Sequence, residues 1–263
     1  MNIRRIVTEK ALKHGIDLGV MKQSFKPKND TWYKQNLDEF LSQRGEDTTF
    51  EVCVENPYLN DRHDEGGTMY GAYFHQDLLV ARLIHSACPR THVDIGSRTD
   101  GFVAHVASFR KIELIDIRPI RSSVRNVIFR QADLMKLPDG LKSYTDSISS
   151  LHAIEHFGLG RYGDPVDYWG YIKALDNIYE MLERCGTFYF SVPIGPQRIE
   201  FNAHRVFSVQ HLLDVMLPKY DVASLSIIND AGELFEDVRF SEPQIANNYG
   251  CNYGCGVFVL RKK

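Results

Sequence analysis

Three titratable side chains stand close together in one short stretch of the sequence, where they could move a proton. The stretch Leu151–Asp164 contains His152, Glu155 and His156 and directly follows a predicted buried strand. A histidine titrates near neutral pH, so it can take the proton of an attacking hydroxyl group. We therefore regard His152 and His156 as candidate general bases and Glu155 as a candidate substrate-binding residue. The alternative is that one of the three caps the following turn and another packs inward.

A second polar group, from Glu200 to Phe207, follows the next predicted strand. It contains His204, the third candidate base, and Arg205, whose forked donors could hold an anionic acceptor. A loop that is merely stabilised by hydrogen bonds from Asn202 and Arg205 explains the same residues equally well.

The segment Gly158–Asp164 carries three glycines together with Arg161, Tyr162 and Asp164. This combination suits a rim that hydrogen-bonds a polyhydroxylated substrate, and it also suits a purely structural turn. Asp164, Glu155 and His156 could in principle gather around a divalent ion. We predict no metal site, because these residues do not have the tight spacing of metal ligands.

The segment Asp94–Gly101 has the composition of a nucleotide-binding loop. A predicted strand ends at Gly96 and passes through a short loop into a helix, so that backbone N–H groups face a polar ligand. Asp116 stands twenty residues beyond Gly96 at the end of the next strand, where a carboxylate can accept both ribose hydroxyls. Asp133 follows a third strand, where it could meet an adenine amino group. Each acid alone is typical of a turn or a cap, but three strand ends in this order favour a nucleotide site.

With these motifs, the sequence from about Tyr73 to Lys262 resembles the class I S-adenosylmethionine (SAM)-dependent methyltransferases. The resemblance implies that SAM contacts Asp94, Gly96, Ser97, Arg98, Gly101, Asp116, Ile117, Asp133 and Leu134. The stretch Leu151–Asp164 resembles an uncharacterised methyltransferase-like family, some of whose members are associated with surface-glycan biosynthesis. The resemblance therefore implies methyl transfer to an oxygen of a sugar or glycan-biosynthesis intermediate.

The predicted loop departs from the usual pattern at two positions. Arg98 and Asp100 stand where the superfamily usually carries its second and third glycines. Gly101 could supply flexibility one residue later, and Arg98 could either turn towards the methionine carboxylate of SAM or point to solvent. A catalytically degenerate SAM-fold binding protein is therefore one alternative. A nicotinamide-dependent reductase is another, although Tyr168 and Lys173 are one residue too far apart for a Tyr-x-x-x-Lys pair.

The elements that position these residues alternate along the chain. Strands are predicted at 91–95, 112–117, 127–129, 147–151 and 187–192, and helices at 73–88, 101–109 and 167–183. This alternation predicts an α/β, Rossmann-like and mostly parallel sheet, whose ligand crevice lies at the carboxyl ends of the strands. After a helix at 208–216, strands at 223–228 and 256–260 have no long helix between them. They predict an antiparallel C-terminal edge pair.

Residues 1–60 are predicted to form an N-terminal cap or lid, and residues 61–263 the methyltransferase domain. The first segment contains helix-like patterns at 4–18 and 31–42 and an extended run at 50–54. The sequence leaves open whether this segment is a lid or the contact of a homodimer.

Composition narrows the class of partner and the compartment. The formal net charge of -3 lacks the basic footprint of proteins that neutralise many phosphates, so nucleic acid is not the expected partner. No apolar stretch approaches the roughly 20 residues of a membrane helix. The start of the chain has no apolar run of signal-peptide length, and we expect a cytoplasmic protein. The five scattered cysteines are expected to be free thiols.

Overall fold

The computed structural model describes residues 31–59 and 61–263, and the chain divides into two units, Met1–Thr68 and Met69–Lys263. In the first unit, helix α3 (Thr31–Arg44) has no buried residue and is followed by the short turn η1 (Asp61–His63). The predicted helix at 31–42 is confirmed. Residues 50–54, which were predicted to be extended, are not part of any strand. In this respect the prediction is wrong. The predicted helix at 4–18 lies outside the described residues.

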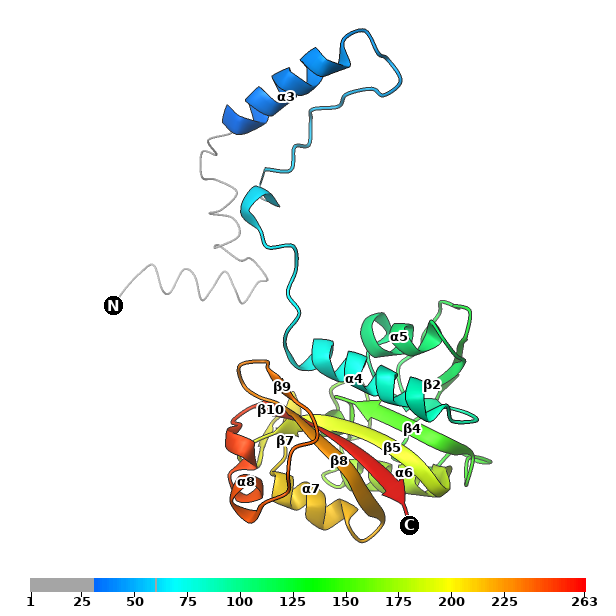
Figure 1. The fold of residues 1–263 in the computed structure, drawn as a ribbon. Helices are drawn as coiled ribbons and strands as arrows, with labels where there is room; N and C mark the ends of the chain where they lie inside the picture. Colours follow the sequence, from blue (N-terminus) through cyan, green and yellow to red (C-terminus); the bar gives the residue numbers. More distant parts are fainter. Residues whose placement is uncertain (1–30, 60) are drawn as a thin grey trace, which may run out of the picture. The chain divides into compact units, whose positions relative to one another are not determined.

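The second unit is built on an eight-stranded sheet (Figure 1). Its strands are β1 (Val93–Ile95), β2 (Ile112–Asp116), β3 (Val127–Gln131), β4 (Thr145–Leu151), β5 (Leu182–Ile194), β8 (Tyr220–Ile228), β9 (Leu234–Phe235) and β10 (Gly254–Lys262). The order is β3-β2-β1-β4-β5-β10-β8-β9. Strands β1 to β5 run parallel, whereas β10 is antiparallel to both β5 and β8. The predicted mostly parallel sheet with an antiparallel C-terminal pair is confirmed.

The last strand lies inside the sheet and not at its edge. β10 is inserted between β5 and β8, and the two-residue strand β9 forms the outer edge. Residues 254–258 of β10 are buried, as expected for a strand that is covered on both faces. A second, two-stranded sheet of β6 (Arg198–Glu200) and β7 (His204–Val206) extends the chain after β5.

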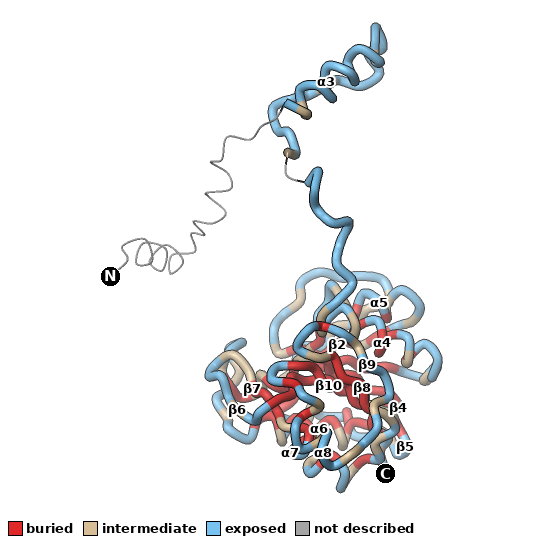
Figure 2. The backbone as a smooth tube through the Cα atoms, turned by 60° about the vertical axis from the view of Figure 1, so that its left-hand side comes forward, coloured by how far each residue is buried: buried red, intermediate tan, exposed pale blue. Residues whose placement is uncertain are grey.

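Helices cover both faces of the large sheet (Figure 1). Helices α4 (Ala72–Ala87) and α5 (Ala104–Ala107) pack on one face, and α6 (Gly170–Met181) and α7 (Val209–Met216) pack on the other. The buried residues gather along the central strands and the inner faces of these helices (Figure 2). Ile84 of α4 and Ile178 of α6 are fully buried, and burying such a side chain stabilises the fold by about 1.5 to 3 kcal/mol.

Some element bounds differ from the prediction. The helix predicted at 101–109 begins as a π-helical turn η2 (Thr99–Val103) and runs into α5. The helix predicted from residue 167 begins at Gly170, because the Asp167 carboxylate accepts the backbone N–H of Trp169 at 2.9 Å and closes a turn there. Strand β5 begins five residues before the predicted strand, with Cys185 in the left-handed region at φ 60°.

Among the described residues, no helix combines the length and the apolar character that crossing a membrane would require.

Candidate functional site

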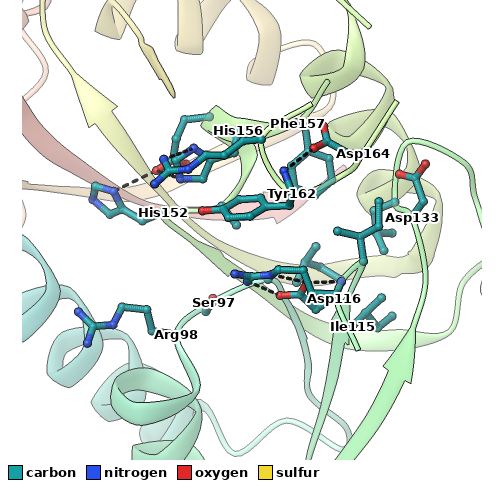
Figure 3. A pocket seen from close by; sticks show the side chains of 18 of the residues that line it. Ser97, Arg98, Ile115, Asp116, Asp133, His152, His156, Phe157, Tyr162 and Asp164 are labelled. Carbon is teal, nitrogen blue, oxygen red and sulfur yellow. Dashed lines mark hydrogen bonds and ion pairs between the residues drawn. The ribbon is translucent and has the colours of Figure 1, made fainter. Parts of the chain in front are cut away.

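A cavity of about 650 Å³ opens at the carboxyl ends of strands β1, β2, β3 and β4 (Figure 3). This volume lies within the range of small-molecule and cofactor sites. Most of the site residues predicted from the sequence line it, namely Gly96, Ser97, Arg98, Asp116, Ile117, Asp133, Leu134, His152, Glu155, His156, Arg161, Tyr162, Asp164 and His204. The fold therefore brings both predicted groups, the strand-end acids and the histidines, into one space.

The loop after β1 turns at Gly96, whose φ of 70° favours glycine. A Cβ atom there would also lie 3.1 Å from the Cβ of Ala153, so a side chain at this position would crowd the loop after β4. The predicted glycine at the strand end thus has a steric reason, and it leaves the backbone open towards the cavity.

Asp94 does not line the cavity, although the sequence predicted a contact with the cofactor. It is fully buried, and its Oδ1 accepts the hydroxyls of Ser97 and Ser149, each at 2.6 Å. Its Oδ2 accepts the backbone N–H of Ser97 at 3.0 Å. Burial raises the pKa of Asp94 to about 6, although these hydrogen bonds oppose the shift. Asp94 therefore positions the loop after β1 through these hydrogen bonds, from outside the cavity.

Gly101 also lies outside the cavity lining, contrary to the expected cofactor contact. A Cβ atom on Gly101 would lie 2.2 Å from Oδ2 of Asp77 on α4. The glycine thus allows the turn η2 to approach α4 closely.

Arg98 lies at the edge of the cavity, at the far side from Asp133 (Figure 3). Its guanidinium forms a two-pronged ion pair with Asp100, at 3.1 and 2.8 Å, and stands over the ring of Tyr73 at 4.7 Å from the ring centre. The Arg98 side chain is exposed, as in the solvent-facing alternative considered from the sequence, and its partner Asp100 is exposed as well.

Asp116 is buried at the end of β2 and faces the cavity. Both of its oxygens are bonded to Arg118, since Oδ1 accepts from the backbone N–H at 2.8 Å and from Nε at 3.0 Å, and Oδ2 accepts from Nη2 at 2.7 Å. Arg118 in turn stands over the ring of Tyr162 at 4.4 Å. The strand-end acid therefore has a cationic partner inside the site.

Asp133 lines the end of the cavity beyond β3. Its Oδ1 accepts the backbone N–H of Met135 at 2.9 Å, which leaves Oδ2 without a protein donor among the described residues. Leu134 is buried beside it and Ile117 is half-buried, so this end combines one carboxylate with apolar walls.

His152 follows β4 with a backbone φ of 51°, a strained value for a residue other than glycine. Its Nδ1 donates to Oε1 of Glu155 at 3.1 Å, and its ring packs against Tyr73 with 5.1 Å between ring centres. Burial opposes a charge on His152, but Cys255 and Glu155 outweigh burial and raise its pKa well above the usual value.

His156 has the opposite character. Its Nδ1 lies 2.7 Å from the carbonyl oxygen of Ala203, so Nδ1 must carry the proton and Nε2 the lone pair. Burial is the main cause that lowers its pKa below the usual value, although Glu155 opposes the shift. His156 is therefore neutral at neutral pH, with Nε2 available as a base.

His204, at the start of β7, completes the cluster. Its ring lies 6.5 Å from that of His156 and 5.1 Å from that of Tyr253, measured between ring centres. Its Nε2 is 3.4 Å from Oε2 of Glu200, without the geometry of a hydrogen bond.

The loop 158–164 is held in shape by Asp164. One carboxylate oxygen accepts the backbone N–H groups of Gly158 and Gly160, and the other accepts that of Tyr162. Asp164 lines the cavity, but its hydrogen bonds serve the loop. The loop places Tyr162 between His156 and Asp116 (Figure 3).

Arg205 lies outside this cavity, contrary to the predicted contact with the acceptor. Its buried guanidinium donates to the backbone carbonyls of Glu155, Phe157 and Tyr168, at 3.3, 2.6 and 3.1 Å. It borders a separate, smaller hollow of about 200 Å³. The arginine thus ties β7 to the segment that carries the histidines, as in the structural alternative considered from the sequence.

Residues 106–262 match the model of a family described as Caenorhabditis protein of unknown function, DUF268. This chain belongs to the DUF268 family. The match spans more than half of the chain and includes the cavity residues from Asp116 to Tyr253. No curated protein matches the DUF268 chain.

Several solved structures are similar to the DUF268 chain. One is the 1,6-didemethyltoxoflavin-N1-methyltransferase of Burkholderia thailandensis with bound 1,6-didemethyltoxoflavin and S-adenosylhomocysteine. It is 16% identical with a TM-score of 0.51, over 72% of this chain and 78% of that chain. Another is the N-methyltransferase NodS from Bradyrhizobium japonicum WM9 in complex with S-adenosylhomocysteine, 13% identical with a TM-score of 0.48, over 73% and 88% of the two chains. The first likeness shows that the DUF268 chain has the Rossmann-like fold of the class I methyltransferases, as the sequence predicted.

Among the residues that shape the cavity of the DUF268 chain, sequence reasoning missed Arg118 and Tyr253. Arg118 had a readable signal, because it stands two residues after the strand-end acid. Tyr253 had none, since it reaches the site through the insertion of β10. Within the described ranges, no group of three or more His, Cys, Asp or Glu side chains could hold a metal ion.

Proposed function

We propose that this chain is a SAM-dependent methyltransferase that methylates a hydroxyl group of a sugar or glycan-biosynthesis intermediate. The observation that carries the proposal is that the strand ends at Gly96, Asp116 and Asp133 share one cavity with the predicted base histidines. In open α/β sheets, ligands bind in the crevice at the carboxyl ends of the strands. The Burkholderia neighbour, which has the same fold, holds S-adenosylhomocysteine.

The residues at one end of the cavity fit the cofactor. The backbone at Gly96 and Ser97 would face the methionine portion, Asp116 the ribose hydroxyls, and Asp133 with Leu134 the adenine. When bound, SAM supplies a methyl group on a positively charged sulfur. Such a fit requires that the backbone at residue 96 is accessible from the cavity. Gly96 meets this requirement because it has no Cβ atom, which would be crowded at this position.

His156 is the general base that the geometry favours. Its Nδ1 donates to the carbonyl of Ala203, and its Nε2 lies 3.7 Å from Oε1 of Glu155, beyond hydrogen-bond distance, so that it can accept the proton of an acceptor hydroxyl. Nε2 would hold this proton while the methyl group of SAM passed to the acceptor oxygen and the sulfur kept the electron pair of the broken carbon–sulfur bond. His152 is better suited to donate a hydrogen bond to the acceptor, because Glu155 and Cys255 favour its protonated form.

A catalytically degenerate SAM-fold binding protein is the second candidate. It is favoured by one observation, the ion pair that already engages both oxygens of Asp116. In this case the chain would bind SAM without turnover. The predicted cap or lid at residues 1–60 remains part of the proposal under either function.

The experiment combines two measurements on the full chain. Calorimetric titration with SAM, S-adenosylhomocysteine and NADH identifies the nucleotide, and incubation with methyl-labelled SAM and a set of sugars, sugar acids and sugar phosphates detects transfer. We expect binding of both sulfur compounds and label in a hydroxylated acceptor. Binding of NADH alone would contradict the proposal, and SAM binding without any transfer would favour the degenerate protein.

A further inference from the structure

Three arginines line the cavity, and one of them differs from the other two. Arg98 and Arg118 each form an ion pair with a carboxylate, at 2.8 and 2.7 Å. Within the described part of the chain, Arg161 forms no such pair. Its Nη1 donates to the carbonyl of Ala203 at 2.9 Å and lies 3.4 Å from Nδ1 of His156. Arg161 is thus a cation of the cavity wall whose charge no carboxylate balances directly.

The position of Arg161 is nevertheless fixed. The carbonyl of Ala203 accepts a hydrogen bond from Nη1, and the guanidinium stands over the ring of Tyr162 at 5.2 Å from the ring centre. A guanidinium has five N–H donors in a planar fork, and Nη1 alone is used here. The donors of Nε and Nη2 remain for a ligand. A side chain that is already immobilised loses less conformational entropy when it binds one.

The neighbouring side chains offer a second feature. Four buried polar atoms have no hydrogen-bond partner among the described residues, and three of them are Nε2 of His152, Oε2 of Glu155 and Nε2 of His204. All three residues line the same cavity as Arg161. Leaving a buried polar group without a hydrogen bond is unfavourable. Hydroxyl groups can both donate and accept, so a polyhydroxylated ligand could remove this cost at all three atoms.

We propose that the acceptor is a hydroxylated anion, whose carboxylate or phosphate group is bound by Arg161 and whose reacting hydroxyl lies against Nε2 of His156. This inference rests on the proposed function, since it names the acceptor class of the same cavity. It also assigns the anion-binding role to Arg161 in place of Arg205, which is buried outside the cavity and donates to three backbone carbonyls.

The test titrates the protein saturated with S-adenosylhomocysteine with three probes, glucuronate, glucose 6-phosphate and glucose. We expect at least one anionic probe to bind about tenfold or more tightly than glucose, as charge-assisted hydrogen bonds to a guanidinium require. The probe that binds distinguishes a carboxylate from a phosphate as the anionic group. In Arg161→Gln this preference should vanish, while the affinity for S-adenosylhomocysteine stays the same and shows that the variant is folded.

Arg198→Gln is the matched control. Arg198 also stands over a tyrosine ring, that of Tyr253 at 6.0 Å, but it is paired with Glu200 and does not line the cavity. This variant should keep the preference for the anion. Equal affinity for all three probes, no binding of either anion, or an equal loss in both variants would overturn the inference. Failure to bind S-adenosylhomocysteine at the outset would instead defeat the proposed function.

Discussion

The two ends of the cavity differ in how their polar groups are paired. At the end beside β2, Arg118 already bonds both oxygens of Asp116. At the other end, buried atoms of His152, Glu155 and His204 have no partner within the described residues. A ligand at the first end must therefore exchange an existing ion pair, whereas a ligand at the second end supplies hydrogen bonds that are missing. Removal of Arg118 at the first end and removal of His156 at the second should accordingly have effects of opposite sign.

The largest expected effect is at the unpaired end. His156→Asn should reduce the rate of methyl transfer by about 10²- to 10⁴-fold, because the general base is lost. SAM affinity should change little, since the cofactor residues lie at the other end. Initial rates with methyl-labelled SAM measure the rate of methyl transfer, and direct titration measures the affinity for SAM. A loss of affinity equal to the loss of rate would show that the two ends are not separate.

The pH profile sharpens the same assignment. Burial lowers the pKa of His156 below its usual value of 6.5, so the folded protein keeps its base unprotonated down to lower pH than free histidine does. The rate should be flat near neutral pH and fall tenfold per pH unit only below pH 6.5. A rate that already falls between pH 8 and pH 7 would point to a base with a raised pKa, as His152 has.

A smaller effect is expected for Asp94, whose carboxylate is hydrogen-bonded to Ser97 and Ser149 beneath the loop after β1. Asp94→Ala should destabilise the fold by about 2 to 3 kcal/mol, because the three hydrogen bonds that hold Ser97 and Ser149 are lost. The pKa of Asp94 is raised to about 6 in the folded protein, so its carboxyl contributes stability at low pH that is lost as pH rises from about 4 to about 6. Urea denaturation at pH 4 and pH 7 measures both quantities. A variant as stable as the parent would remove the structural role that we assign to Asp94.

The smallest effect has the opposite sign. Arg118→Met should tighten SAM binding by several-fold, about 1 kcal/mol, because the ribose hydroxyls no longer displace a charged partner from Asp116. Titration of SAM into the variant measures the change. Weaker binding would mean that Arg118 itself contacts the cofactor, and the contrast between the two ends would then disappear.

The sequence alone predicted every strand of the large sheet except the two-residue strand β9, and several of the residues that line the cavity. The period-two and helical patterns define the elements, and the topology rule then places residues such as Gly96 and Asp116 at one edge. It could not predict which way a side chain turns. Arg205 stands one residue from His204 and points elsewhere, because three carbonyls accept its donors.

The sequence alone also could not predict how strands from distant parts of the chain pair. The insertion of β10 between β5 and β8 depends on contacts between distant segments, and it brings Tyr253 to the cavity. Nothing in the local pattern of residues 254–262 distinguishes an inner strand from an edge strand. The two-residue spacing of Asp116 and Arg118 could have indicated their ion pair. The geometry of the pair could not be predicted, because it depends on the turn after β2.

The most direct test of the central claim is the titration of SAM into the parent protein and into Asp116→Ala. The account predicts that the parent binds SAM and that the variant binds it more weakly by about 1 to 3 kcal/mol, since a charge-assisted hydrogen-bond pair to the ribose is lost. Identical affinities for the two proteins, or no binding of SAM by the parent, would contradict the assignment of this cavity as a SAM site.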